Sequence, residues 1–355
     1  EELARRVKNE LPSGWEKALP TYTTSDSAVA TRKLSEIVLT KIESVLPELI
    51  GGSADLTPSN LTRWSDAVDF QPPSTGLGDY SGRYIRFGVR EHGVGAIING
   101  ISAYGANFKA YGATFLNFVS YASGAVRLSA LSGHPIIWVA THDSIGLGED
   151  GPTHQPIETL AHLRAIPNLM VWRPADGNET SAAYHQALSS KHTPAIIALS
   201  RQNLPQLEGS SIEKAVKGGY TIYEVESPKL ILVSTGSEVS TSIDAAKLLA
   251  EQGTPTSVVS LPDFHTFDLQ PKDYKLSVLP DGIPIMSVEV MSPSGWSGYS
   301  HVQFGINRFG MSAPAPEIYK AFEFTPEGIA KRGQLTVDYY KGCLLYTSPS
   351  PRDST

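Results

Sequence analysis

Short runs with the character of buried strands alternate with helix-like segments along most of this chain, and that alternation restricts its fold more than any other feature. Residues 135–143, 168–176 and 194–201 are rich in β-branched and aromatic side chains, as is typical of strands buried on both faces. Residues 177–192, between the last two runs, have the pattern of a helix. Together they predict a βαβ unit, which belongs to a parallel sheet covered by helices.

The same alternation continues on both sides of this unit. Residues 28–50 place apolar side chains at helical spacing. The stripe consists of Leu34, Ile37, Val38, Ile42 and Leu46. Residues 229–236 and 255–263 are predicted strands, and residues 237–253 between them are a predicted helix that ends on Gly253. We therefore expect an α/β fold with two parallel or mostly parallel sheet domains, each covered by helices.

Polar and turn-rich segments divide the chain into predicted domains. Residues 202–219 are polar and turn-rich, and residues 343–355 form an abrupt Pro/Ser-rich stretch that contains Cys343, the one cysteine. We interpret that stretch as a non-native or disordered tail. The predicted division is a connector at 1–20, a first domain at 21–201, the linker at 202–219, a second domain at 220–342 and the tail.

Composition and charge narrow the classes of function. The chain has 355 residues and a formal net charge of −7 at pH 7, which argues against a nucleic-acid surface because such a surface is basic. A phosphorylated substrate stays open, since the local placement of Arg and His decides its binding. No apolar run approaches the roughly 20 residues of a membrane span.

The cysteine count and the first residue bear on the compartment. One cysteine allows no disulfide framework within the chain, and we expect a cytoplasmic protein. The chain starts without Met, so we expect further sequence upstream, which leaves an organelle presequence open.

A glycine-rich stretch after the predicted strand at 135–143 concentrates titratable side chains. Residues 141–156 read THDSIGLGEDGPTHQP and include His142, Asp150 and His154. In α/β proteins, binding sites lie on the loops at the carboxyl ends of the strands. The pattern favours a functional loop over a surface loop with internally bonded histidines.

Two other interpretations of this loop fit less well. Residues 146–151 match the G-x-G-x-x-G pattern of dinucleotide sites, but Pro152 and Pro156 interrupt the region where such a site needs a helix to begin. The two histidines and the aspartate could ligate a metal ion, but the chain has no HExxH helix, no close His pair and no CxxC. We expect neither a nicotinamide cofactor nor a metal site in this chain.

Three further motifs carry side chains suited to a site. An aromatic triplet spaced by three along a predicted helix fits either core packing or a wall for a flat ring. Its members are Phe115, Phe118 and Tyr121. Glu91 lies at the predicted start of a small-residue helix, where a carboxylate also suits the helix dipole. Asp55 and Ser59 lie on a Gly-rich turn, which alone indicates a turn and a helix cap.

Taken together, these motifs resemble the transketolase family. Six motifs occur in the order found in that family: ATRKLSE, GGSADL, GVREHG, FLNFVSY, the loop from His142 to His154, and LSRQNLP. Each motif is weak alone, but six in order argue strongly against accidental similarity. The resemblance covers about residues 1–342 and corresponds to the pyrimidine-binding and C-terminal domains of the family.

The resemblance implies thiamine diphosphate as the cofactor. The implied reaction is transfer of a two-carbon ketol group between sugar phosphates, as in the pentose phosphate pathway or the Calvin cycle. Glu91 would contact N1′ of the aminopyrimidine and exchange a proton with it. Phe115, Phe118 and Tyr121 would enclose the aminopyrimidine. Asp55 would lie near the thiazolium and the dimer interface.

The resemblance also implies a sugar-phosphate site. The residues that match the phosphate-binding positions are Arg32, Ser59, His142 and Arg201. Guanidinium, imidazole and hydroxyl groups suit a phosphate because charge-assisted hydrogen bonds are strong and directional. Asp150 would bind a sugar hydroxyl. His154 would bind the donor carbonyl or C1 hydroxyl and assist proton transfer.

One part of the family pattern has no counterpart in this sequence. That part is the diphosphate-binding domain, with its G-D-G motif and its ligands for Mg²⁺ or Ca²⁺. The family builds each active site between that domain of one subunit and the pyrimidine domain of the other, so this chain would supply half of each site. We expect a homodimer in the complete enzyme or a separate N-terminal subunit, and no activity from the chain alone. A truncated transketolase and a naturally split one both stay open.

Three alternative functions share some of these features. The β subunit of a 2-oxo acid dehydrogenase E1 has the same two domains, but the phosphate-binding set argues against it. Dihydroxyacetone synthase shares most of the motifs and differs in its acceptor. A non-catalytic partner subunit would be expected to lose Glu91 or the aromatic triplet, and both are present.

Overall fold

An eight-stranded parallel sheet forms the centre of the N-terminal unit. The computed structural model describes residues 1–343 and 345. The strand order is β4-β3-β5-β2-β6-β7-β9-β8, and every pairing is parallel. In that order the strands are Gly78–Asp79, Asp69–Phe70, Tyr84–Arg86, Leu49–Ser53, Lys109–Phe115, Ile137–Thr141, Ala195–Leu199 and Met170–Trp172. A separate antiparallel ribbon pairs β1 (Val29–Ala30) with β10 (Asn203–Leu204).

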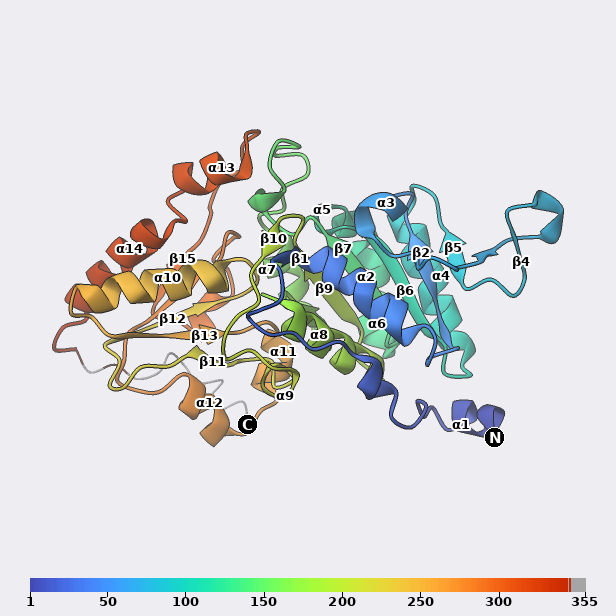
Figure 1. Ribbon diagram of the computed structural model, residues 1–355, viewed down its shortest axis with the longest axis horizontal. Helices are drawn as coiled ribbons and strands as arrows, with labels where there is room; N and C mark the ends of the chain where they lie inside the picture. The colour runs from blue at the N-terminus through green and yellow to red at the C-terminus, as the bar shows by residue number, and fades with distance from the viewer. Residues whose placement is uncertain (344, 346–355) are drawn as a thin grey trace.

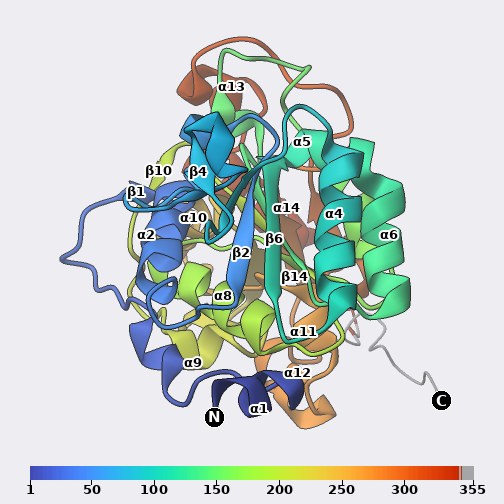
Figure 2. The ribbon, with the colours of Figure 1, turned by 90° about the vertical axis from the view of Figure 1, so that its right-hand side faces the viewer.

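Helices cover both faces of this sheet (Figures 1 and 2). Helices α4 (Glu91–Tyr104) and α6 (Ser123–Ser132) lie side by side on one face, and α2 (Thr31–Ile42) and α8 (Gly177–Ser189) pack together on the other. Every residue of β6, β7 and β9 is buried, as expected for a parallel sheet covered on both sides. The shorter helices of the unit are α1 (Glu2–Val7), α3 (Thr57–Asn60), α5 (Leu116–Val119), α7 (Thr159–Arg164) and α9 (Ile212–Ala215).

The C-terminal unit contains a smaller, mostly parallel sheet in the order β11-β13-β12-β14-β15. Only the pairing of β11 with β13 is antiparallel. In that order the strands are Tyr220–Tyr223, Thr256–Ser260, Leu230–Ser234, Ile285–Val288 and Val302–Phe304. Side chains alternate between two apolar clusters along β12, so both faces of this sheet are packed. The predicted α/β fold with two such sheets is confirmed.

Helices pack around the smaller sheet (Figure 1). Helices α10 (Glu238–Glu251) and α14 (Pro326–Tyr339) pack against each other on one face. Helices α11 (Phe264–Asp268) and α12 (Lys272–Val278) contribute Phe264, Phe267 and Val278 to the apolar cluster on the other. Helix α13 (Ala315–Ala321) lies at the top of the unit and touches the 3₁₀ helix η4 (Ile145–Leu147) of the N-terminal unit.

The first predicted helix is shorter than expected. Most of the apolar stripe of residues 28–50 is buried, but α2 ends at Ile42 and β2 begins at Leu49. Pro47 lies between them. Proline lacks the N–H of a helix interior and disfavours helical backbone at the residue before it. Residues 28–50 therefore contain β1, α2 and the start of β2, where apolar spacing alone predicted one helix.

The predicted linker carries structure of its own. Residues 202–219 include β10 and helix α9, which packs against α8; the domain boundaries stay a prediction. Cys343 is exposed, and the rest of the predicted tail at 343–355, except residue 345, lies outside the described residues. In the part of the chain that is described, no helix has the length and apolarity to cross a bilayer.

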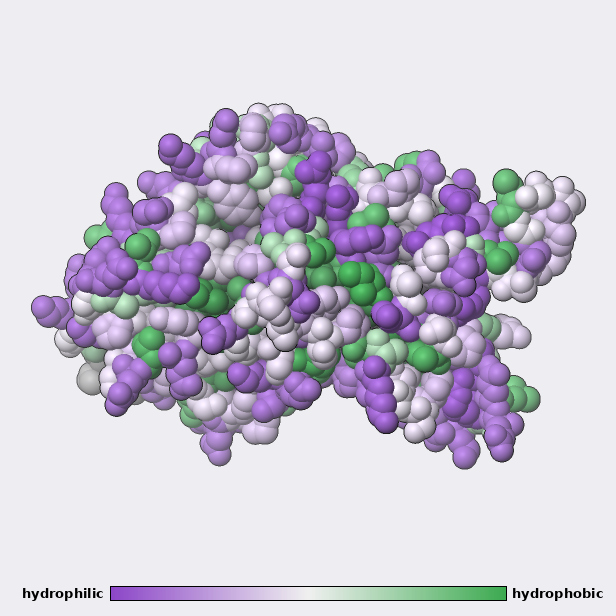
Figure 3. All heavy atoms as spheres, in the orientation of Figure 1, coloured by the Kyte–Doolittle hydropathy of each residue, from purple (hydrophilic) through white to green (hydrophobic). Residues whose placement is uncertain are grey.

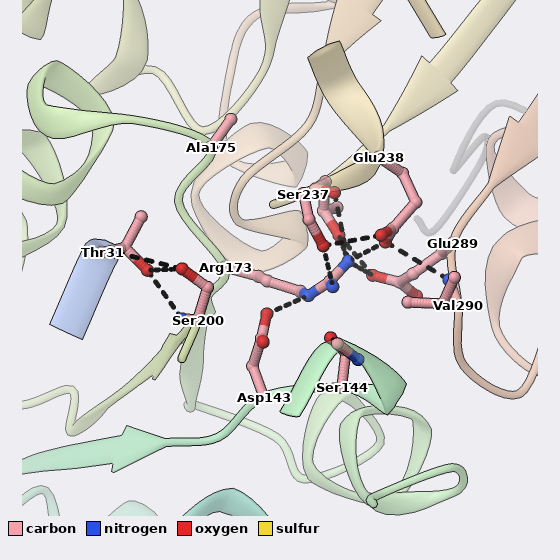
Figure 4. Close-up of polar contacts among 12 residues, drawn as sticks. Thr31, Asp143, Ser144, Arg173, Ala175, Ser200, Ser237, Glu238, Glu289 and Val290 are labelled. Carbon is pink, nitrogen blue, oxygen red and sulfur yellow. Dashed lines mark hydrogen bonds and ion pairs between the residues drawn. The ribbon is translucent and has the colours of Figure 1, made fainter. Parts of the chain in front are cut away.

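A buried arginine joins the two units (Figure 4). Arg173 follows β8, and its side chain has no exposed surface. Its Nε donates to Asp143 Oδ2 at 2.9 Å within the N-terminal unit, and its Nη1 donates to Glu238 of the C-terminal unit. Burial alone would lower the pKa of Arg173, but the surrounding carboxylates raise it well above its usual value. The guanidinium therefore stays charged inside the protein.

A second arginine completes this interdomain network. Arg164 donates two hydrogen bonds to Glu289, each 2.8 Å long, and Trp296 Nε1 donates a third at 2.8 Å. Although burial would raise the pKa of Glu289, the two arginines hold it at about 2. A backbone hydrogen bond also connects the two units, because Gly236 N donates to the carbonyl of Arg173 at 3.0 Å. Charge and backbone hydrogen bonds together fix how the units dock.

Replacing Arg173 with Met should destabilise the chain strongly. The thioether roughly keeps the volume but leaves Glu238 and Asp143 buried without their counter-ion, so we expect a loss of about 3–5 kcal/mol in the free energy of unfolding. Urea unfolding at pH 7, followed by circular dichroism, measures it. Lys247→Met is the matched control because Lys247 pairs with Asp244 on the surface, where such pairs contribute about 0–1 kcal/mol. Equal stability of R173M and the unmodified chain would show that the network adds nothing.

Candidate active site

The predicted site residues come from loops at one edge of the eight-stranded sheet. Strands β2, β6, β7 and β9 are neighbours and parallel, so their carboxyl ends meet at the same edge. The residues that end or follow these strands are Asp55, Phe115, His142 and Arg201. Glu91 and Arg32 lie in the first turns of α4 and α2, and both helices begin at this edge.

Close packing of α4 on the sheet places Glu91. It is the first residue of α4 and is 9% exposed. Thr114 Oγ1 donates to Glu91 Oε1 at 3.2 Å. The helix comes close to β6 because Gly112 has no side chain: a Cβ there would lie 2.5 Å from Cγ1 of Val94. The carboxyl is therefore fixed beside the end of β6.

The sequence predicted that the aromatic triplet lies along one helix, and this prediction is wrong. Phe115 ends β6, Phe118 belongs to α5, and Tyr121 belongs to the 3₁₀ helix η3 (Ser120–Ala122). The spacing of three does not show that Phe115 ends a strand, and it cannot distinguish an α-helix from the 3₁₀ turn that holds Tyr121. Ring centroids of Phe115 and Phe118 are 5.6 Å apart, and those of Phe118 and Tyr121 are 6.1 Å apart. Because Phe115 is buried and Tyr121 is 70% exposed, the rings form a wall from the core to the surface.

Two histidines lie against this aromatic wall. His142 stacks on Phe115 with ring centroids 3.8 Å apart, and His154 meets Phe118 edge-on at 5.2 Å. Burial lowers the pKa of His142 to about 3, and nearby positive charges, Arg32 foremost, add to the effect. His142 is therefore a neutral imidazole near pH 7.

Pairing of α2 with the end of β9 brings two arginines together. Ser200 N donates to Thr31 Oγ1 at 2.7 Å, and Thr31 N donates to Ser200 Oγ at 3.0 Å (Figure 4). These bonds set the next residues, Arg32 and Arg201, near each other. Burial lowers the pKa of Arg32, and the charge of Arg201 lowers it further. Two neighbouring guanidinium groups favour an anion between them.

Gln155 fixes the loop that carries Asp150 and His154, a role that the sequence analysis missed. Its side chain is 2% exposed. Nε2 donates to the carbonyls of Gly148 at 2.9 Å and Met311 at 2.8 Å, and Oε1 accepts from Met311 N at 3.0 Å. Met311 belongs to the C-terminal unit, so one buried amide ties the loop to that unit. The only sequence signal was its position beside His154.

The remaining predicted site residues, Asp55, Asp150 and Ser59, make few contacts with the other predicted site residues. Asp55 and Asp150 are exposed on loops at the same edge, and among the described residues no hydrogen bond or ion pair joins either to another predicted site residue. Ser59 contacts Arg32 through its carbonyl, which accepts from Arg32 Nη1 at 2.8 Å. The glycine-rich segment at 146–151 does not lead directly into an α-helix, because the next one, α7, begins at Thr159. Within residues 1–343 and 345, no group of three or more His, Cys, Asp or Glu side chains is placed to hold a metal ion.

Comparison with known proteins decides the family. The model of the transketolase pyrimidine-binding domain matches residues 27–206, and that of the transketolase-like C-terminal domain matches residues 218–325. The chain belongs to the transketolase family. The resemblance predicted from the six motifs is thereby confirmed.

Individual relatives agree with this assignment. The chain is 72% identical over 341 residues to a transketolase of Kluyveromyces lactis, which covers 96% of this chain and 50% of that protein. It is 71% identical over 344 residues to transketolase 1 of Saccharomyces cerevisiae, covering 97% and 51%. A crystal structure of Pichia stipitis transketolase in complex with sedoheptulose 7-phosphate has a TM-score of 0.98 at 69% identity, covering 100% of this chain and 52% of that one. This transketolase-family chain thus spans about half the length of the relatives it matches.

Replacing Gln155 with Ala should loosen the loop. The change leaves the N–H and the carbonyl of Met311 without the partners that Gln155 supplies, while the Gly148 carbonyl keeps only the bond from Gly151 N. A buried unpaired polar group costs about 1–3 kcal/mol. We expect backbone amides of residues 148–156 and 310–313 to exchange with solvent roughly tenfold faster or more, measured by hydrogen–deuterium exchange. Gln252→Ala, at an exposed position after α10, is the matched control. Unchanged exchange in both segments would rule out the clamp.

Proposed function

We propose that this chain takes part in the thiamine-diphosphate-dependent, reversible transfer of a two-carbon ketol group from a ketose phosphate to an aldose phosphate, and that it supplies half of each active site. The observation that carries the proposal is the meeting, at one sheet edge, of a buried glutamate, an aromatic wall and a pair of guanidinium groups. Membership of the transketolase family supports it. The pentose phosphate pathway or the Calvin cycle would use such a reaction.

The residues at this edge fit the aminopyrimidine end of the cofactor. Phe115, Phe118 and Tyr121 offer ring faces and edges for a flat heterocycle. Glu91 Oε1 accepts from Thr114, which leaves Oε2 to hold and exchange a proton with N1′. When bound, thiamine diphosphate supplies the carbon nucleophile that receives the two-carbon unit. This chain's part is to orient the ring and to move one proton at Glu91 Oε2.

The neighbouring cluster is the proposed substrate site. Arg32 and Arg201 supply charge to a sugar phosphate, and the neutral ring of His142 and the Ser59 hydroxyl add directional hydrogen bonds. On the adjoining loops we place three further contacts: Asp150 to a sugar hydroxyl, His154 to the donor carbonyl or C1 hydroxyl, and Asp55 near the thiazolium.

Exposed apolar side chains support a partner at this site. Helices α4 and α6 lie side by side on the outer face (Figure 2), and apolar patches of this kind mark protein interfaces. The exposed apolar residues of the two helices are Ile97, Tyr104, Leu128 and Leu131. The segment around β4 projects from the molecule as an arm (Figures 1 and 3). Phe70 and Leu77, which precede β4 in the chain, are exposed. We propose that a second subunit, either a copy of the complete enzyme or a separate N-terminal chain, covers these surfaces and brings the Mg²⁺ or Ca²⁺ ligands.

The alternatives are less well supported. A 2-oxo acid has no phosphate, so a 2-oxo acid dehydrogenase β subunit would not need the arginine pair. A non-catalytic partner subunit would not need the glutamate and the aromatic wall together. Dihydroxyacetone synthase differs in its acceptor alone, so substrate tests must distinguish it. A cytoplasmic location remains part of this proposal.

Replacing Glu91 with Gln should abolish ketol transfer in the assembled enzyme. An amide at this position cannot exchange the proton, and loss of a general acid or base typically costs 10²–10⁴-fold in rate. We would express the chain, combine it with a separately produced N-terminal diphosphate-binding half, and measure transfer from xylulose 5-phosphate to ribose 5-phosphate. We expect turnover in the mixture and at least a roughly 100-fold loss with E91Q.

Two controls accompany this assay. Glu251→Gln alters an exposed glutamate at the end of α10 and should leave turnover unchanged. The chain without the N-terminal half should give none. Turnover by the isolated chain, or full activity of E91Q in the mixture, would overturn the proposed division of the active site.

A further inference from the structure

A chain of four buried side chains leads from the β2 loop to His142. Leu56 N donates to Ser53 Oγ at 3.1 Å, and Ser53 Oγ donates to Asn60 Oδ1 at 2.6 Å. Asn60 Nδ2 donates to Thr141 Oγ1 at 2.7 Å, and Thr141 Oγ1 lies 2.9 Å from His142 Nδ1. The side chains of Ser53, Asn60, Thr141 and His142 are all 3% exposed or less. Water therefore has little access to any link.

The order of donors and acceptors in this chain has one consistent direction. Ser53 Oγ accepts from a backbone N–H, and its own hydrogen goes to the carbonyl oxygen of Asn60, which turns the Asn60 amide group toward Thr141. Thr141 Oγ1 accepts from that amide, so its hydrogen is available for His142 Nδ1. The reversed direction would leave the Ser53 hydroxyl hydrogen without an acceptor in a buried place.

We infer that Asn60 and Thr141 act as positioning residues that fix the tautomer of His142, so that Nδ1 is an acceptor and Nε2 carries the proton. A neutral imidazole has one donor and one acceptor nitrogen, and the bond made by one nitrogen determines the role of the other. With Nδ1 bound to Thr141, Nε2–H is the donor that remains. The functional role of this tautomer rests on the proposed phosphate site. The hydrogen bonds that fix the tautomer can be tested without any assay of activity.

The surroundings of His142 support a neutral donor. Phe115 covers one face of the ring, with centroids 3.8 Å apart. The charged and titratable groups that act on the ring are Arg32 from α2, Arg201 after β9 and His154 on the adjoining loop, and all three disfavour an imidazolium. The arginines then carry the charge for a bound phosphate, while His142 adds one directional N–H that does not depend on pH near neutrality.

The sharpest test reverses the hydrogen-bond direction. Asn60→Asp puts a carboxylate, which only accepts, between Ser53 and Thr141; the Thr141 hydroxyl should turn toward it, and His142 Nδ1 should become the donor. The readout is the two-bond ¹H–¹⁵N spectrum of the chain labelled with [¹⁵N]histidine, in which the two tautomers differ. We expect the Nε2–H form of His142 in the unmodified chain and a proton on Nδ1 in N60D.

Further variants keep this test decisive. Thr141→Val removes the hydroxyl at nearly constant volume and should give a measurable Nδ1–H population, and Thr141→Ser should restore the original spectrum. His301 is an internal reference because its Nδ1 accepts from Ile285 N at 3.0 Å, and its signal should not move. An Nδ1–H form in the unmodified chain, or an unchanged His142 signal in both N60D and T141V, would overturn the inference. If neither variant folds, the unmodified chain's spectrum alone decides.

A kinetic measurement separates this inference from the proposed function. In the enzyme assembled with its N-terminal half, T141V should raise KM for a phosphorylated sugar roughly tenfold more than for the same sugar without phosphate. Equal changes in the two KM values would refute a role at the phosphate. Absence of turnover in every assembly would count against the proposed function. The inference about the tautomer of His142 would then be decided by the spectra alone.

Discussion

Both the arrangement of the two units and the candidate site depend on the ion pairs made by the guanidinium group of Arg173. It binds Glu238 of the C-terminal unit and Asp143 of the N-terminal unit, and Asp143 directly follows His142. His142 has a positive φ of 60°, a backbone conformation that costs of order 1–3 kcal/mol outside glycine and persists only where its surroundings impose it. Here Thr141 fixes the imidazole on one side and Arg173 fixes the next residue on the other. Docking of the two units therefore also holds the backbone of the proposed phosphate site.

A buried charge network is a poor source of stability in itself, because desolvation offsets most of the attraction. Its value in this protein lies in geometry. The hydrophobic effect has no preferred direction, whereas the paired bonds from Arg164 to Glu289 form in one relative position of the units. That position brings Met311 to Gln155. The C-terminal unit, which contributes none of the predicted site residues, thereby holds in place the loop that bears His154.

The sequence predicted some of the buried strands but not the central strands β2 and β6, and it missed the polar network, for physical reasons. Strands β7 and β9 are buried on both faces, so their composition alone identifies them. Polar side chains take partners far away in sequence. Asn60 lies 81 residues from Thr141 and Gln155 lies 156 residues from Met311, and no local pattern encodes such a pair. Glu91 and Arg32 are predicted site residues because the family motifs include them. The aromatic triplet was predicted to lie on one helix and does not, so a spacing of three residues alone does not identify a helix.

Exposure differs sharply across the site, and the difference indicates what this chain completes by itself. His142 is 3% exposed and Arg32 is half-buried, whereas Arg201 is exposed, so the chain's own elements enclose the proposed phosphate-binding groups only in part. Tyr121 is 70% exposed, Asp55 is exposed, and the apolar faces of α4 and α6 continue outward from the same region. A ring stacked on an aromatic wall gains more from contact where water is removed from both of its faces. Under the proposed function, this chain itself would enclose the substrate at His142, whereas the exposed part of the aromatic wall would need a second protein surface to become a closed pocket.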